Sequence, residues 1–118
     1  MFLFDTYAII EIIRGNENYI PYLDRRILIN NFIYAELCYI LDKEGHPDTD
    51  MILEKYKRFI VELDPEIIRK AMGFRYKNRK KKLSITDCVS YFQAKEYNIS
   101  FLTGDKEFEH MENVEFVK

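Results

Sequence analysis

Short runs of β-branched and aromatic residues alternate with helical stretches along this chain. The runs predict strands at residues 2–4, 27–29, 59–63, 99–102 and 114–117. The stretches between them predict helices over 7–15, 31–45, 49–58, from Pro65 onward and over 84–98. Strands that alternate with helices favour a mostly parallel sheet. We therefore expect residues 1–118 to form a single α/β domain.

The length and composition support a folded domain and exclude several other classes of protein. The 118 residues are 47% hydrophobic, which is enough for a core and argues against disorder. The four glycines lie too far apart for a phosphate-binding loop, and two cysteines cannot build a four-thiolate zinc site. The N-terminus lacks a basic segment, and no apolar stretch approaches the roughly 18 residues of a membrane-spanning helix. We therefore expect a cytoplasmic protein that does not enter a membrane.

Acidic residues directly follow two of the predicted strands. Asp5 comes after the first run, and Asp105 follows Thr103-Gly104 after the fourth. Each has an ordinary structural interpretation, since Asp caps helices and occupies turns. However, ligands of parallel sheets bind at the carboxyl ends of the strands. The position of both acids therefore indicates a binding site at this edge of the sheet.

Two further acids lie on helices that are expected to face the core. Glu36 shares the apolar stripe of its helix with Ile33 and Ile40, where a lone carboxylate is costly unless it is paired or bound to a metal. The alternative is a position at the edge of the stripe, with access to water or an arginine. Asp87 completes the capping-box pattern that begins at Ser84, which is a sufficient structural role by itself. The helix that follows is too apolar for a surface helix, so Asp87 is expected to face the strand ends.

Four carboxylates from separate parts of the chain would repel one another if they met in one site. A divalent cation removes this repulsion, and oxygen ligands suit Mg²⁺ or Mn²⁺. Such ions lower the pKa of an attacking water and shield the negative charge that develops during phosphodiester cleavage. The four acids therefore indicate a metal-dependent enzyme that acts on phosphodiester bonds.

The same residues resemble a PIN domain, and within that superfamily the small toxin nucleases of the VapC type. The matching segments are Phe4-Asp5-Thr6, Ala35-Glu36-Leu37, Asp87 with Ala94, and Leu102-Thr103-Gly104-Asp105 with Phe108. They span almost the whole chain in the order of the family. The resemblance implies a three-layer sandwich in which helices flank a central, mostly parallel five-stranded sheet.

The resemblance also implies an activity, a set of site residues and partners. The catalytic and metal-binding acids would be Asp5, Glu36, Asp87 and Asp105. Thr6 and Thr103 match the hydroxyl positions that support these acids, and Thr103 is the better candidate for orienting a ligand or water. The implied activity is cleavage of single-stranded RNA, with Mg²⁺ or Mn²⁺ as cofactor, by the toxin of a toxin–antitoxin pair. The implied protein partners are an antitoxin and a second copy of the chain.

Two positions depart from the pattern of the family, and one apolar segment has two interpretations. Cys88 replaces a common alanine, and Gly104 stands where many members carry a basic or polar residue that could contact a phosphate. The apolar residues of segment 19–23 are expected either to pack in the core or to contact a protein partner.

Residues 75–82, which we call the basic segment, concentrate positive charge. The segment holds six of the 18 basic residues, and without it the net charge of the chain falls from −2 to −8. Its basic side chains are Arg75, Lys77, Arg79, Lys80, Lys81 and Lys82. One interpretation is a solvated helix end, where cations are favoured by the helix dipole. The other is a surface for RNA phosphates, with Tyr76 available to stack on a base.

Three further functions are compatible with parts of the sequence. A PIN nuclease that processes ribosomal RNA would use the same acids. A phosphatase or phosphoacceptor domain could place its nucleophile at Asp5, but the D-x-D-x-T pattern is absent. A catalytically silent RNA-binding or scaffold protein would keep the fold without turnover. Because all four acids are present, the sequence favours an enzyme.

Overall fold

Four short parallel strands form the sheet of this protein in a computed structural model that describes residues 1–118. They are β1 (Phe2–Phe4), β2 (Ile27–Leu28), β3 (Ser100–Thr103) and β4 (Val114–Phe116), in the spatial order β2-β1-β3-β4. Phe4 pairs with Leu102 of β3, and Leu3 pairs with Leu28 of β2. All three strand pairs are parallel, so the predicted mostly parallel sheet is confirmed.

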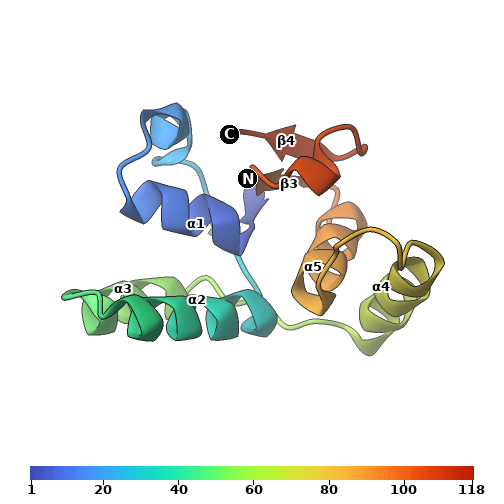
Figure 1. The fold of residues 1–118 in the computed structure, drawn as a ribbon, viewed down its shortest axis with the longest axis horizontal. Coiled ribbons are helices and arrows are strands. Elements are labelled where there is room, and N and C mark those ends of the chain that lie inside the picture. Colours follow the sequence, from blue (N-terminus) through green and yellow to red (C-terminus); the bar gives the residue numbers. More distant parts are fainter.

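Helices cover both faces of the sheet, and this gives the expected three layers (Figure 1). The helices are α1 (Thr6–Ile13), η1 (Glu17–Tyr22), α2 (Asn31–Glu44), α3 (Thr49–Lys57), α4 (Pro65–Lys77), α5 (Ile85–Glu96) and η2 (Lys106–Phe108). Helix α1 packs on β1 and β3 from one side, with α2 and α3 beyond it, while α5 packs from the other side with α4 (Figure 1). None of the helices is both long and apolar enough to cross a membrane.

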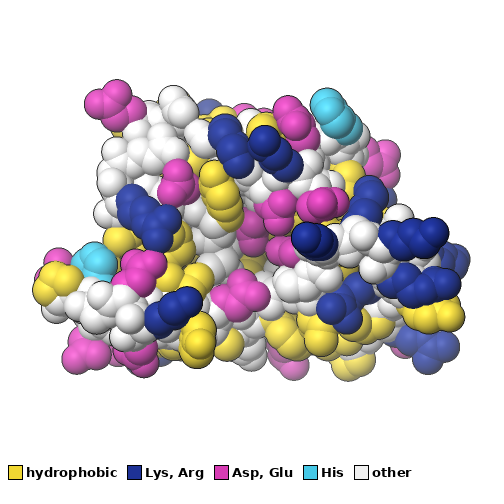
Figure 2. All heavy atoms as spheres, viewed as in Figure 1, with side chains coloured by type: hydrophobic (Ala, Val, Ile, Leu, Met, Phe, Trp, Pro, Cys, Tyr) yellow, Lys and Arg dark blue, Asp and Glu magenta, His cyan; other side chains and the backbone are white.

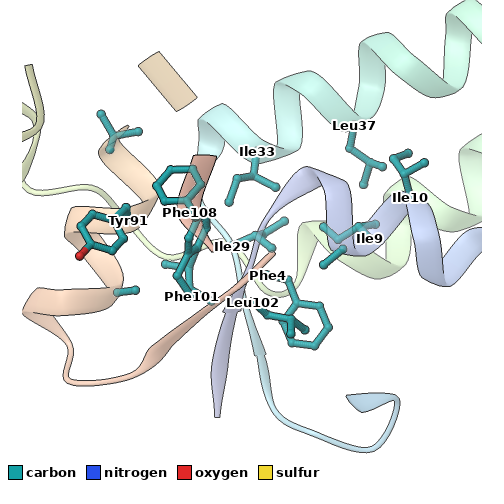
Figure 3. Packing of buried hydrophobic residues seen from close by; sticks show 14 of the residues in the cluster. Phe4, Ile9, Ile10, Ile29, Ile33, Leu37, Tyr91, Phe101, Leu102 and Phe108 are labelled. Atoms are coloured by element: carbon teal, nitrogen blue, oxygen red, sulfur yellow. The ribbon is translucent and has the colours of Figure 1, made fainter. Parts of the chain in front are cut away.

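The core fixes β1 and β3 against each other through side chains on both faces of the sheet. Because side chains alternate along a strand, Phe101 and Leu102 point to opposite layers. Phe101 packs against Phe108 and Tyr91 of α5, with ring centroids 5.2 and 6.4 Å apart, and Leu102 lies beside Phe4 in the opposite layer (Figure 3). Phe101 is fully buried, which contributes about 2 kcal/mol. This packing holds the carboxyl ends of the two strands in a fixed relation.

The prediction of a fifth strand over residues 59–63 is wrong, because these residues do not form a strand. Only Ile60 takes part, in an isolated parallel bridge with Ile29. The pairing cannot extend beyond Ile29, because the next residue, Asn30, is the N-cap of α2 and the helix begins directly after it. The carbonyl of Glu62 then accepts a hydrogen bond from the Gln93 side chain of α5 (3.3 Å) instead of a strand. The sheet therefore has four strands, and its β2 edge is only partly covered.

The order of the strands creates a crevice between β1 and β3. From β1 the chain passes through α1 to β2 on one side, and it returns through α2 to α5 to reach β3 on the other side of β1. Such a reversal in strand order leaves an opening at the carboxyl ends of the two strands. Asp5 and Asp105 follow these two strands directly.

Candidate active site

Asp5 lies at the base of the crevice, where β1 ends and α1 begins. Its backbone N–H donates to the carbonyl of Leu102 (2.9 Å), which continues the ladder between β1 and β3. Its Oδ1 accepts from the backbone N–H of Thr6 (2.8 Å) and its Oδ2 from the hydroxyl of Thr103 (2.7 Å). The residue is only 4% exposed. The carboxylate of Asp5 is therefore an N-cap of α1, as one interpretation predicted, and is also held rigidly at the strand ends.

The electrostatic environment of Asp5 disfavours its charged form. Burial raises the pKa of Asp5 to about 7, and repulsion from Asp87 and Glu36 adds to this shift. The hydrogen bonds from Thr103 and Thr6 act in the opposite direction but do not outweigh burial. At neutral pH the negative charge at this position is therefore poorly compensated by the protein itself.

Glu36 reaches the crevice from α2, and its partner is a hydroxyl group. The hydroxyl of Thr6 donates to Glu36 Oε1 (2.8 Å). Glu36 is half-buried, so it lies at the edge of the apolar stripe and avoids the full cost of burying a charge. Thr6 thus connects two acids, since its backbone N–H binds Asp5 and its side chain binds Glu36.

Asp87 comes from the first turn of α5 and forms the predicted capping box with Ser84. Ser84 N–H donates to Asp87 Oδ2 (2.9 Å), and Asp87 N–H donates to the Ser84 hydroxyl (3.0 Å). Burial raises the pKa of Asp87, and repulsion from Asp105 and Glu36 contributes. The cap orients the carboxylate toward the other acids and does not exclude a second role.

Asp105 caps the short helix η2 and is tied to Asp5 through a shared threonine. Its Oδ1 accepts from the backbone N–H of Glu107 (3.0 Å). Its own N–H donates to Thr103 Oγ1 (3.1 Å), the same hydroxyl that donates to Asp5. Thr103 is fully buried and has no access to solvent. Its hydrogen bonds hold Asp5 and Asp105 from beneath, and its predicted role of orienting a ligand or water stays a prediction.

All four predicted acids line one hollow of about 370 Å³ between α1, α2 and α5. In Figure 2 acidic side chains gather in the middle of the face at this place, with Lys and Arg side chains on both flanks. Thr6 lines the same hollow. The structure therefore brings together side chains that are up to 100 positions apart in the sequence.

The hollow also has basic and aromatic walls that the sequence analysis missed. Tyr7 of α1, Arg14 directly after α1 and Lys43 of α2 line it. Arg14 is paired with Glu44 (2.8 Å), whereas Lys43 has no ion-pair partner. Helical spacing could have found Lys43, which lies seven residues after Glu36 in α2 and therefore shares one helix face with it.

The structure explains why position 104 departs from the family pattern. A Cβ atom on Gly104 would collide with the ring of Tyr7 and the backbone carbonyl of Val117. The ammonium group of Lys118 lies against the Gly104 carbonyl (3.4 Å) and 5.5 Å from the centre of the Tyr7 ring. A positive charge therefore stands beside this loop, although it comes from another residue.

The carboxylate oxygens of the hollow are of the type that suits a hard divalent cation, although no group of three or more acidic, histidine or cysteine side chains is arranged to hold a metal ion as a closed cage. Each acid accepts a hydrogen bond from a donor group of the protein. In Glu36, Asp87 and Asp105, however, the second carboxylate oxygen makes no hydrogen bond to the protein. Mg²⁺ keeps several waters and is bound through one or two carboxylates, so a closed cage is not required. The poorly compensated charge of Asp5 supplies the electrostatic reason for a cation here.

The basic segment lies beside the hollow and does not line it. Arg75 and Lys77 end α4, and the remaining four cations occupy the connection to α5. The Arg75 side chain donates to the Leu83 carbonyl (3.0 Å), and the Arg79 guanidinium lies 4.5 Å from the centre of the Tyr76 ring. Positive side chains cover this flank in Figure 2. The ring of Tyr76 is 68% exposed, with Arg79 stacked over it.

The fold and the site together define an α/β sandwich with an acidic pocket at the switch point of a parallel sheet. The chain belongs to the PIN domain family, because the family model matches residues 2–114. The predicted resemblance is thus confirmed. No curated protein sequence matches the chain significantly.

Several solved structures share this fold at low sequence identity. VapC20 from Mycobacterium tuberculosis, described as a sarcin-ricin loop cleaving toxin, has a TM-score of 0.82 at 12% identity, with all of both chains covered. A toxin–antitoxin complex from Klebsiella pneumoniae has a TM-score of 0.75 at 20% identity, covering 98% of this chain and 96% of that one. VapBC2 from Rickettsia felis, bound to a DNA fragment from its promoter, has a TM-score of 0.74 at 16% identity and covers 99% and 98%.

Proposed function

We propose that this protein is a divalent-metal-dependent endoribonuclease that cleaves single-stranded RNA as the toxin of a toxin–antitoxin pair. The observation that carries the proposal is the hollow in which Asp5, Glu36, Asp87 and Asp105 meet at the carboxyl ends of parallel strands. Membership of the PIN domain family supports the assignment to hydrolases of nucleic acids. Neighbours in fold that are toxins or toxin–antitoxin complexes support the biological role.

The four acids are the proposed ligands of Mg²⁺ or Mn²⁺. When bound, such an ion would offset the carboxylate charge, lower the pKa of an attacking water and shield charge on the phosphate. Asp5 is fixed by two hydrogen bonds at the base of the hollow. Glu36, Asp87 and Asp105 each keep one carboxylate oxygen without a protein partner, which is available to a cation or its waters.

The two threonines keep the acids in position for this chemistry. Thr6 fixes Glu36 relative to Asp5, and Thr103 fixes Asp5 relative to Asp105. Both threonines are buried, so their hydrogen bonds do not compete with bulk water. The hydrogen-bond partners of both hydroxyl groups are acids of the hollow.

RNA is the proposed substrate because positive charge flanks the acidic hollow. The basic segment, with the cations at 75, 77 and 79–82, would bind phosphates on one side of the cleavage point. The other side carries Arg14 and Lys43. Exposed Tyr76 offers a face for a base, which favours a single strand with accessible bases.

An antitoxin and a second copy of the chain are the proposed protein partners. Large apolar side chains are exposed on the surface, among them Ile20 (59%), Leu23 (57%) and Tyr39 (69%). In segment 19–23, Tyr19 is fully buried in the core, whereas Ile20 and Leu23 face solvent. Tyr19 thus belongs to the core, and the exposed Ile20 and Leu23 are proposed as part of the surface that contacts a partner.

Cleavage of a labelled single-stranded RNA tests the proposed activity. Wild type, Asp5→Asn and Asp87→Asn are compared with Mg²⁺, with Mn²⁺ and with EDTA. Asp64→Asn is the matched control, because Asp64 also caps a helix with its side chain but is exposed and outside the hollow. We expect metal-dependent cleavage by wild type and the control, and loss of cleavage in the two other variants.

Two results would overturn the proposal. Cleavage that survives both substitutions and chelation contradicts the metal site. RNA binding without cleavage in either metal indicates the silent RNA-binding alternative. The biological role is tested separately by induced expression in cells, where growth arrest that requires Asp5 and is relieved by the product of an adjacent gene is the expected result. Normal growth with full nuclease activity in vitro would instead favour ribosomal RNA processing.

A further inference from the structure

A second cluster of positive charge lies at the amino end of β2 and has no role in the proposed nuclease. Arg25 and Arg26 directly precede β2, while Lys55 and Arg58 come from the end of α3. All four side chains are exposed, and none is within ion-pair distance of a carboxylate. Asp24 is the only acid that lines the same groove. Among the residues that line the groove, four are cationic and one is acidic, so its lining carries a net positive charge.

These cations surround a groove of about 460 Å³ between two backbone segments, 23–28 and 58–61. More than half of its lining residues are hydrophobic, and they belong to both segments: Leu23, Ile27, Leu28, Phe59, Ile60 and Val61. The groove therefore combines an apolar lining with a basic surround. It is found where the predicted fifth strand does not form.

The edge of β2 presents unused backbone groups to this groove. Ile29 donates to Phe59 and accepts from Val61, so its backbone groups point away from β1. The carbonyl of Arg26 accepts from Phe2 of β1 and thus points the other way. Because backbone groups alternate along a strand, the N–H and C=O of Ile27 point away from β1 into the groove. A ladder that continued past Ile29 would place Arg58 opposite Ile27, but Arg58 ends α3 and is not extended.

The groove is separate from the acidic hollow. All strands of the sheet are parallel, and the acids follow the carboxyl ends of β1 and β3. The cationic groove lies at the amino end of β2, which is the opposite edge of the sheet. None of its lining residues lines the acidic hollow.

We infer that this groove binds an acidic, extended peptide segment of a partner protein, whose main chain pairs with the backbone groups of Ile27 at the β2 edge. The cations match the negative side chains of such a segment, and the Ile27 backbone matches its main chain. Side chains alternate along an extended peptide, so one face of it can cover the apolar lining while the other carries carboxylates. A nucleic acid would use the cations but leave the strand edge unpaired, so the peptide accounts for more of the observed features. The inference does not depend on the proposed nuclease activity.

Binding of a synthetic peptide tests this inference. The probe is a fluorescein-labelled peptide of about six residues, in which Glu and Val alternate, measured by anisotropy at low salt. The comparison peptide has Lys in place of Glu. We expect the Glu peptide alone to bind, and the double variant Arg26→Glu, Arg58→Glu to weaken its binding at least about tenfold. Hydrogen exchange at the Ile27 amide is expected to slow when the peptide is present.

The control carries the same change of charge elsewhere. In Arg69→Glu, Lys70→Glu the substituted side chains are exposed on α4, away from both sites. An equal loss of binding in this control would show that only overall charge matters and would overturn the inference. So would the absence of peptide binding. A third result would also overturn the inference and identify a nucleic-acid surface instead. In that case oligouridylate binds more tightly than the peptide and displaces it, and hydrogen exchange at the Ile27 amide is not slowed.

Discussion

Replacing Asp5 by Asn should stabilise the metal-free protein at neutral and alkaline pH. The pKa of Asp5 rises from 3.8 to about 7 on folding. Since a one-unit shift corresponds to about 1.4 kcal/mol, ionisation of this buried group costs roughly 4 kcal/mol of folding free energy above pH 7. In Asn the oxygen that accepts from Thr103 is replaced by an NH₂ group, which cannot accept, while the other oxygen stays with the Thr6 N–H. The lost hydrogen bond offsets about 1–2 kcal/mol of this gain. The free energy of unfolding should therefore increase by about 2–3 kcal/mol, which corresponds to a rise in Tm on the order of 10 °C.

The stability gained by Asp5→Asn should increase with pH. An acid whose pKa is raised in the folded state stabilises the protein below its unfolded pKa, and that stability is lost as the pH rises through the folded value. The advantage of Asp5→Asn should therefore be absent near pH 4 and complete near pH 8. Thermal unfolding followed by circular dichroism in EDTA, at several pH values between these limits, measures it.

The control for this experiment is again Asp64→Asn. Asp64 caps α4 with the same type of hydrogen bond, to the N–H of Glu66 (2.9 Å), but it is exposed. Because Asn and Asp cap helices about equally well, this variant should change the stability by less than about 0.5 kcal/mol at every pH. An Asp5→Asn variant that is less stable than wild type at pH 8, or whose effect does not change with pH, would refute the electrostatic description of the site.

Four further predictions concern the metal, the supporting residues and the basic segment. Excess Mg²⁺ should raise the Tm of wild type but not of Asp5→Asn; at ten times the Kd the gain is about 1.4 kcal/mol, and equal shifts would place the ion elsewhere. Thr103→Val should cost about 1–3 kcal/mol in urea unfolding and weaken metal binding measured by calorimetry, because the hydrogen bond to Asp5 is lost. Ser84→Ala should cost about 1 kcal/mol in thermal unfolding and lower cleavage, because the cap that orients Asp87 is lost; unchanged cleavage would contradict the positioning role. Charge reversal at residues 80–82 should weaken RNA binding and flatten its dependence on salt, whereas an unchanged salt slope would remove the segment from the RNA surface.

The local parts of the fold could be predicted because each rests on neighbouring residues. The run at 2–4 ends at an Asp that caps the next helix, and Asp64 with Pro65 begins α4 as expected. The strand expected at 59–63 failed for a reason that is not local. Its residues suit a strand, but β2 offers only Ile29 as a partner, and the Glu62 carbonyl is bound by a side chain from α5.

The acids of the candidate site could be recognised from the sequence, whereas their surroundings could not. Position relative to strands and helix caps singled out the four acids, and the structure places all of them in one hollow. The hydroxyl of Thr6 as the partner of Glu36 depends on how α1 packs against α2, which no local pattern encodes. The same holds for Arg14 on the rim and for the buried position of Thr103. The cationic groove escaped notice because its two segments are about 30 residues apart in the sequence.

The crowded position of Gly104 limits the order in which this loop can change. A basic residue there could contact a phosphate, yet the ring of Tyr7 occupies the space its side chain would need. A mutation at 104 is therefore tolerated only after Tyr7 has been replaced by a smaller residue and the backbone at Val117 has shifted. A substitution at 104 should consequently be found only together with a smaller residue at 7, so that position 7 sets the fitness effect of a change at 104.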